Sequence, residues 1–138
     1  MKKYELTDET KVVCGHTLHR IKAIVDFSFV KKGEIGGWIE REHNLAQDGN
    51  SWVYEDACVF DNAEVFGNAR VLGDAEVFGD AMVCDNARVY DDARVFGAAR
   101  VFEDARVFGD ACVFGNADVF GSARVSGDAC VFDNAEVY

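Results

Sequence analysis

Residues 57–68 read ACVFDN followed by AEVFGN, two copies of one six-residue phrase. The phrase continues almost without error to Tyr138, with a valine every six residues from Val53 and an alanine every six residues from Ala57. A repeat this short cannot bury its own apolar side chains, so neighbouring copies must stack on one another. The pattern therefore predicts a solenoid.

A second period, of eighteen residues, lies inside the first. Three columns at this spacing are uniform in residue type: Phe60, Phe78, Phe96, Phe114 and Phe132; Arg70, Arg88, Arg106 and Arg124; and Asp56, Asp74, Asp92, Asp110 and Asp128. A coil of three hexads explains this uniformity, because residues one coil apart then lie above one another at a strand spacing of about 4.8 Å. We therefore expect residues 51–138 to form an all-β, three-sided parallel β-helix of about five coils.

Alternation within each strand predicts which side chains enter the core. Ala57 and Val59, with their successors, face inward, so Cys58 and Phe60 face outward. Corners are expected at Gly67, Gly73 or Asp61, each followed by Asn or Asp, because these residue types tolerate unusual backbone angles. The column that begins at Asp56 is expected at one corner, where its carboxylates cap backbone N–H groups. A calcium site is disfavoured, because no second set of ligands flanks this column at a recognisable spacing.

Residues 1–50 lack the hexad and are expected to form an N-terminal cap. The stretches at 4–6 and 11–13 flank turn-forming residues at 7–10, which predicts a hairpin; residues 18–24 alternate as a further strand, and a turn-rich segment follows. A solenoid needs such a cap, because an uncovered end exposes a strand edge and an apolar core. The side chains expected to cover the first coil are Trp38, Ile39, Leu45 and Trp52.

The net charge of −11 is unevenly placed. Residues 57–138 carry fifteen acids and six arginines, a net charge of −9, whereas residues 1–56 carry ten acids and eight bases, a net charge of −2. This balance argues against general nucleic-acid binding, which needs a basic surface for the phosphates. It favours a solubilising role for the charge, with acidic mimicry of a nucleic acid as the alternative.

Five cysteines, at positions 14, 58, 84, 112 and 130, show no CxxC spacing. The first residues lead into charged sequence and not into an apolar run, and no stretch reaches the length that spans a membrane. These features predict a protein of the reducing cytoplasm with free thiols and no membrane partner. Cys112 and Cys130 share a column on adjacent coils, which would bring them close together.

Several motifs stand together in the N-terminal half: LHRIKA at residues 18–23, DF at 26–27, GGWI at 36–39, NL at 44–45 and WVY at 52–54. They resemble the head of a family of uncharacterised hexapeptide-repeat proteins of bacteria and their phages. The coils that follow resemble the wider bacterial hexapeptide-transferase superfamily. That resemblance implies a left-handed β-helix, although ordinary crossovers favour the right hand. The position after the inward valine is usually small or acidic in the superfamily, and here it is mostly Phe.

The superfamily resemblance also implies acyl transfer, in which a histidine acts as general base. This chain has only His16, His19 and His43, all of them before the coils, and no lysine follows Lys32 to hold a donor's phosphates. The zinc enzymes of the superfamily need a cluster of histidines, which the coils also lack. We therefore expect no catalytic residue, no metal site and no cofactor, and we regard the histidines as ordinary residues of the cap.

The arginine column is the first candidate binding surface. It is flanked on the same side by Tyr54, Leu72, Tyr90, Phe108 and Ser126. Four stacked guanidinium groups repel one another, so each needs an anion. Neighbouring acids can supply it, and a ligand phosphate or an acidic partner is the alternative, with Tyr90 suited to a nucleotide. The position favoured for a ligand is Arg88 and Arg106, which with Arg94 and Arg100 make four successive Arg hexads.

The phenylalanine column is the second candidate surface. An unbroken aromatic stripe rarely stays in water, so Phe60 to Phe132 are expected to bury against another subunit, in a dimer or in the trimers common among hexapeptide transferases. The sequence ends at Tyr138 in mid-phrase, where an open strand edge offers an end-to-end alternative.

These features favour a non-enzymatic, oligomeric β-helix that serves as a binding or scaffold protein. Two alternatives stay open. One is a phage-encoded antagonist of host defence that captures a nucleotide signal or a protein, as the occurrence of the resembling family in phages suggests. The other is a hexapeptide-type acyltransferase.

Overall fold

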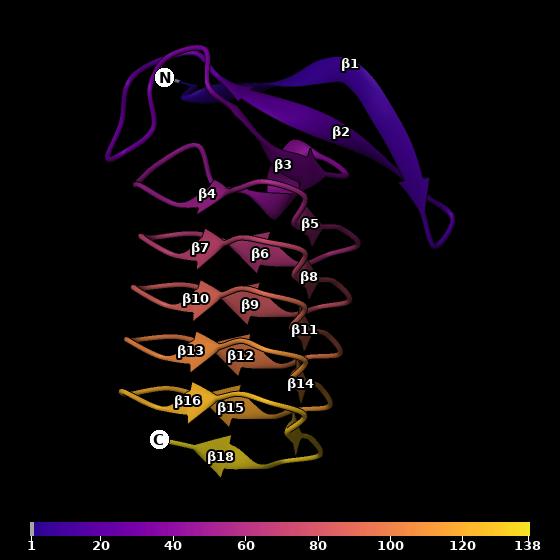
Figure 1. Cartoon of the computed structure of the whole chain (residues 1–138), viewed down its shortest axis with the longest axis vertical. Coiled ribbons are helices and arrows are strands. Elements are labelled where there is room, and N and C mark those ends of the chain that lie inside the picture. The colour runs from indigo at the N-terminus through magenta and orange to yellow at the C-terminus, as the bar shows by residue number, and fades with distance from the viewer. Residues whose placement is uncertain (1) are drawn as a thin grey trace.

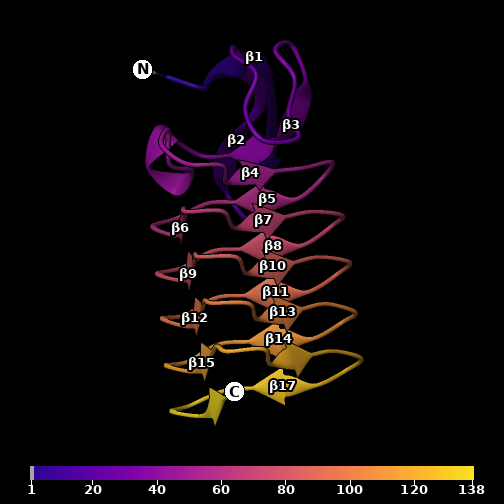
Figure 2. The ribbon, with the colours of Figure 1, turned by 90° about the vertical axis from the view of Figure 1, so that its left-hand side faces the viewer.

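The chain folds into a column of short strands beneath an N-terminal cap (Figure 1). The computed structural model describes residues 2–138. Within these residues three sheets run along the column, and a single 3-10 helix, η1 (Glu42–Asn44), belongs to the cap. Seen from the side, each coil lies directly above the next (Figure 2).

The three sheets are named here by what they carry. The hairpin face contains β1 (Tyr4–Val13), β2 (His16–Ala23), β3 (Ile35–Ile39), β5 (Cys58–Val59), β8 (Glu76–Val77), β11 (Arg94–Val95), β14 (Cys112–Val113) and β17 (Cys130–Val131). The arginine face contains β4 (Trp52–Val53), β7 (Arg70–Val71), β10 (Arg88–Val89), β13 (Arg106–Val107) and β16 (Arg124–Val125). The third face contains β6 (Glu64–Val65), β9 (Met82–Val83), β12 (Arg100–Val101), β15 (Asp118–Val119) and β18 (Glu136–Val137).

The eighteen-residue register is confirmed. Val95 pairs in parallel with Val77 on one side and Val113 on the other, and the same offset holds on all three faces. The arginine face and the third face each have five strands, which matches the expectation of about five coils. On the hairpin face β3 adds a further parallel strand, since Ile39 pairs with Val59.

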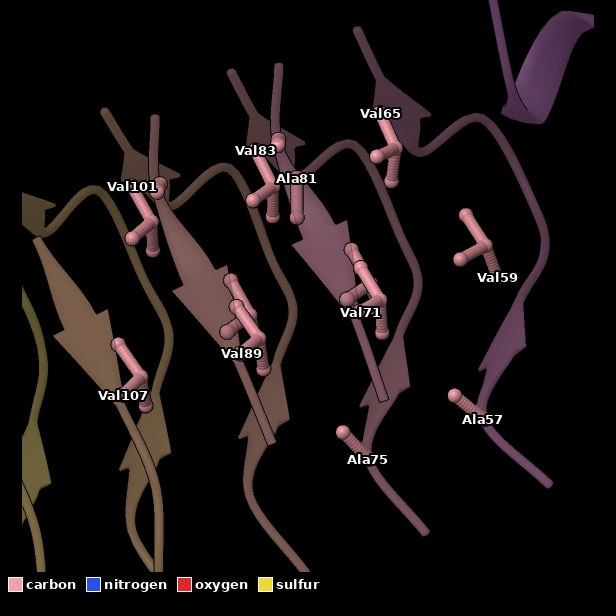
Figure 3. Packing of buried hydrophobic residues seen from close by; sticks show 14 of the residues in the cluster. Ala57, Val59, Val65, Val71, Ala75, Ala81, Val83, Val89, Val101 and Val107 are labelled. Atoms are coloured by element: carbon pink, nitrogen blue, oxygen red, sulfur yellow. The ribbon is translucent and has the colours of Figure 1, made fainter. Parts of the chain in front are cut away.

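The core consists of stacked rows of valine and alanine, as the alternation predicted. The valines from Val59 to Val119 and the alanines from Ala57 to Ala117 are fully buried. Figure 3 shows their side chains pointing into the space that the coils enclose. Small and β-branched side chains suit this narrow interior, because each fits a pleated strand and fills the gap to the coil above.

The corners use a left-handed backbone at their first residue, whether that residue is Gly67 (φ 69) or Asp61 (φ 58). Where it is acidic, its carboxylate accepts the N–H of the residue one coil on, as Asp91 accepts from Gly109 at 3.1 Å. The expectation that the column beginning at Asp56 does this capping is wrong. Among residues 2–138 no backbone N–H donates to its carboxylates, and Asp56 instead lies 3.5 Å from Arg20.

The cap differs in detail from the expected hairpin. The turn falls at Cys14–Gly15, so residues 7–10 belong to β1, which pairs antiparallel with β2 and carries a register shift there. Of the expected strand at residues 18–24, residues 18–23 lie within β2, which ends at Ala23. The hairpin then lies beside the upper coils on one side of the column (Figure 1).

The inward rows begin inside the segment expected to be only a cap. Ile39 lies above Val59, and Leu45 forms a bridge with Val65. Gly37 permits this close approach, because a Cβ on it would lie 2.6 Å from the carbonyl oxygen of Ala57. The rows therefore start before residue 51.

Candidate functional site

Four arginines form one uninterrupted row on the arginine face. Arg70, Arg88, Arg106 and Arg124 occupy the outward position of successive strands and pair with one another in register. Trp52 fills the same position on the first coil, where it is buried beneath the cap. The exposed part of the face is therefore lined by like charges one strand apart, about 4.8 Å.

None of these four arginines forms an ion pair with any carboxylate of residues 2–138. The other two coil arginines do: Arg94 lies 3.4 Å from Glu76 and Arg100 lies 3.7 Å from Asp118. The expectation that neighbouring acids neutralise the row is therefore wrong. The four successive Arg hexads, which contain Arg88, Arg94, Arg100 and Arg106, also do not share one face. Arg94 is on the hairpin face and Arg100 is on the third face.

A cavity of about 300 Å³ lies at the cap end of this row. Its lining residues are Ser28, Asn50, Asn68, Arg70, Asn86 and Arg88. The loop between β2 and β3, which contains Ser28, lies beside the corner that precedes β4 (Figure 1). The cavity is therefore built by three successive coils and the loop between β2 and β3, and two of the four row arginines line it.

An asparagine ladder forms one wall of the cavity. The Nδ2 of Asn50 donates to the Oδ1 of Asn68 at 3.2 Å, and Asn68 donates to Asn86 at 3.3 Å. Asn86 in turn donates to Asp104 at 3.3 Å. Each asparagine thus uses one of its two N–H donors within the ladder and keeps the other. All of these side chains occupy the second position of a corner.

The cap loop brings an aromatic ring to the same place. The Arg70 guanidinium lies over the ring of Phe29, 5.2 Å from its centroid, and Phe29 is 76% exposed. Ser28 beside it adopts a left-handed backbone with φ 48. Burial raises the pKa of Tyr54, while the nearby Arg70 and Arg88 oppose that shift, so the phenol stays protonated.

The charge at the adjoining corner decides which arginines are available to an anion. Beside Arg70 the corner is Gly67–Asn68, which carries no charge. The corner beside Arg88 is Asp85–Asn86, with one acid, and the corner beside Arg106 is Glu103–Asp104, with two. The corner beside Arg124 is Gly121–Ser122, which is again uncharged. The acids of these corners therefore disfavour an anion most at Arg106 and least at Arg70 and Arg124. The cavity lies at Arg70 and Arg88, one coil nearer the cap than the expected centre at Arg88 and Arg106, whose role as an anion site stays a prediction.

Three of the predicted site residues lie outside the cavity. Arg106 and Arg124 continue the row below it, and Tyr90 stacks on Phe108 with ring centroids 4.9 Å apart. Their assignment to a ligand site stays a prediction. The asparagines and Ser28 are not among the residues that the sequence predicts for the site. Asn50, Asn68 and Asn86 also stand eighteen residues apart, so the eighteen-residue period could have identified them.

His16 does not remain an isolated residue of the cap. Its Nδ1 lies 3.0 Å from Glu40 and its Nε2 lies 2.8 Å from Asp61, a corner residue of the coils. The hydrogen bond to Glu40 raises the pKa of His16, and the charge of Asp61 adds to this shift. These three residues form a set whose ligand atoms lie within 4.8 Å of one another and could hold a metal ion. Both ring nitrogens already have a carboxylate partner, so the cluster ties the hairpin to the coils.

The phenylalanine row is stacked, but its first member is not available to another subunit. Phe60 is 2% exposed, because it packs with Leu18 and Trp38 of the cap and lies 5.2 Å from the His16 ring. From Phe78 to Phe132 the rings stack at 4.9–5.4 Å. Tyr138 stacks on Phe120 of the third face and not on this row. The proposed interface therefore loses Phe60 and, on this face, Tyr138.

The cysteines are all free thiols. Burial raises the pKa of Cys84 to about 11 and also raises the pKa of Cys58 and Cys112. A protonated thiol is a poor nucleophile, so these three are unsuited to covalent catalysis at neutral pH. Cys112 and Cys130 are paired neighbours on adjacent strands, as their shared column predicted.

Comparison with known proteins agrees with this architecture. The family model described as YdcK beta-solenoid repeat matches residues 87–103, which amounts to about one coil. The chain is also 39% identical over 67 residues to the "Uncharacterized acetyltransferase YdcK" of Escherichia coli (strain K12). The chain is related to the hexapeptide-repeat β-helix proteins.

The match to the Escherichia coli protein covers only part of each sequence. The match to the Escherichia coli protein covers 43% of this chain and 21% of that protein. The relationship supports the repeat and the fold, while the activity of the whole relative is a separate matter. Within residues 2–138 no helix is long and apolar enough to cross a membrane.

Proposed function

We propose that this chain is a non-enzymatic, oligomeric binding module whose arginine face captures an anionic ligand. The observation that carries the proposal is the row of arginines without carboxylate partners, two of which, Arg70 and Arg88, line a cavity. A folded protein with a net charge of −11 leaves these guanidinium groups uncompensated at one place. An external anion would relieve their mutual repulsion and form charge-assisted hydrogen bonds.

The experiment is a titration of the protein with inorganic phosphate by isothermal calorimetry at low salt. The Arg70→Ala/Arg88→Ala variant should bind at least about a hundredfold more weakly, since each charged hydrogen bond contributes about 1.5–3 kcal/mol. The matched control is Arg106→Ala/Arg124→Ala, which changes the net charge equally but lies outside the cavity. It should retain most of the affinity. Absence of binding in the parent protein would overturn the proposal, as would equal losses in the two variants.

The oligomer is the second part of the proposal and rests on the phenylalanines that follow Phe60 in the row, which are half-buried apart from the exposed Phe132. Phe78, Phe96, Phe114 and Phe132 form a continuous stripe below the hairpin, and Phe132 is 47% exposed. Aromatic surface of this extent is usually covered by a partner. A second copy of the chain is the partner that we propose.

Acyl transfer is the second candidate function, and the printed name of the Escherichia coli relative favours it. The residues that could serve as base are His16, His19 and His43, and both ring nitrogens of His16 are bonded to carboxylates. Assays with acetyl-CoA and mixed hydroxyl and amine acceptors test this candidate. We expect no turnover; turnover that His16→Gln abolishes would replace the binding proposal with catalysis.

A further inference from the structure

The anion cavity has features that exceed what charge capture requires. A simple anion site needs only guanidinium groups, yet this cavity also has a wall of amide side chains and the serine of an overhanging loop. We infer that it takes a compact phosphate monoester whose body carries hydroxyl or amide groups. The phosphate lies between Arg70 and Arg88, and the body lies along the asparagine ladder. This inference rests on the proposed function.

The phosphate position follows from the pairing of the two arginines. Arg70 and Arg88 are register partners on adjacent strands, so their side chains leave the coils about 4.8 Å apart. Phosphate oxygens can accept hydrogen bonds from two guanidinium groups at once. A longer polyanion would have to continue past Arg106, where the corner is Glu103–Asp104. The acids there restrict the ligand to one phosphate-sized anion at the upper end of the row.

The body of the ligand is indicated by the hydrogen bonds that the ladder leaves unmade. Asn68 and Asn86 each donate one N–H and accept one hydrogen bond within the ladder. Each therefore keeps one N–H donor and one oxygen lone pair. A surface that offers donors and acceptors side by side suits hydroxyl and amide groups, which have both. Inorganic phosphate or an apolar tail would leave them unused.

Size and polarity set further limits on the ligand. A volume of about 300 Å³ is at the small end of ligand cavities, which span about 300–1,000 Å³. The bonds of the ladder all run the same way, from Asn50 towards Asp104. The carboxylate at its end accepts hydrogen bonds only and repels phosphate, so the body and not the phosphate faces that end. A sugar phosphate or a nucleoside monophosphate has these properties.

The test compares inorganic phosphate, glucose 6-phosphate, adenosine 5′-monophosphate and adenosine by calorimetry against the full chain. At least one of the two monoesters should bind at least about tenfold more tightly than inorganic phosphate, and adenosine should not bind measurably. The Asn68→Ala/Asn86→Ala variant should reduce that preference to within about threefold while its affinity for inorganic phosphate stays unchanged.

Two further variants guard against loss of the fold. Asn116→Ala/Asn134→Ala removes an equivalent ladder, joined at 3.4 Å, at a different corner and should retain the preference. Ser28→Ala lies outside the coils and should weaken monoester binding without lowering the melting temperature. Equal affinities of the parent for the monoesters and inorganic phosphate would overturn this inference and leave the anion site standing. A monoester preference that survives both Asn68→Ala/Asn86→Ala and Ser28→Ala would also overturn it. If none of the phosphates binds, the proposed function itself is wrong.

Discussion

Replacement of Val95 by Asp is the most direct test of the coil register. Val95 lies in β11, is 0% exposed, and pairs with Val77 above and Val113 below. Coils lie on both sides of it, so neither end of the solenoid can open locally to hydrate the new carboxylate. The substitution therefore places a charge in a buried apolar cluster whose rows within the coils are valine and alanine.

The size of the effect can be built up in two steps. Val95→Ala removes two buried carbon atoms, which costs about 1.6 kcal/mol at about 0.8 kcal/mol per carbon, with a further cost for the cavity. Val95→Asp adds an unpaired buried charge, whose cost is about 3–5 kcal/mol. The sum approaches the whole stability of an ordinary domain, about 5–15 kcal/mol. We expect Val95→Ala to fold with a lower melting temperature and Val95→Asp to lose the middle coils.

Urea unfolding followed by circular dichroism, with hydrogen exchange read by mass spectrometry, measures both outcomes. Val131→Asp is the matched control, because it lies in the same row but is partly exposed on β17. It should be destabilised less than Val95→Asp, and exchange should increase only near β17. A Val95→Asp protein that unfolds cooperatively at the parent's midpoint would show that the register is wrong.

Two further predictions concern the cap and the phenylalanine row. The hydrogen bond to Glu40 raises the pKa of His16, so its stabilisation is fully present below the unfolded value of about 6.5 and is lost as the pH rises through the raised value. The melting temperature of the parent should therefore exceed that of His16→Gln most at about pH 5.5 and converge with it by about pH 9, with His19→Gln as control; a pH-independent difference would contradict this. Phe96→Ser/Phe114→Ser should give smaller particles by light scattering, whereas Phe102→Ser/Phe120→Ser on the third face should not. A monomeric parent protein, or an unchanged particle in the first variant, would refute the proposed side-by-side packing.

The coils could be derived from the sequence because the same physical problem recurs in every hexad. An inward position must be filled by Val or Ala and a corner must adopt a left-handed backbone, so both constraints are visible as periods. Val95 and Gly97 are placed correctly by spacing alone. The assignment of N–H capping failed because both corner residues can be acidic. Only the backbone angles show that Asp91, and not Asp92, points its carboxylate to the next coil.

The cap could not be derived in the same way, because its contacts join residues far apart in a sequence without a period. Asn44 is fully buried and bonds to the backbone of residues 40, 41, 61 and 63. Asn44 therefore holds this corner by side-chain hydrogen bonds, whereas a regular hexad forms its corner with the backbone of its own last residues. The sequence around Asn44 does not indicate this role. The burial of Phe60 has the same origin, since it depends on where the hairpin lies and not on the composition of the coil.

The candidate site combines periodic residues of the coils with a non-periodic residue of the cap. Only some of its residues could therefore be predicted from the sequence. The arginine row is periodic, so Arg70 and Arg88 could be singled out together with Arg106 and Arg124. Their difference lies in what surrounds each coil: asparagine corners and the loop bearing Ser28 lie beside Arg70 and Arg88, whereas the acidic corner Glu103–Asp104 lies beside Arg106. A uniform solenoid offers equivalent positions along its length. The loop of the cap and the corner residues of the first coils turn one of those positions into a cavity. A ligand is therefore expected where the cap meets the coils, and not at the middle of the column.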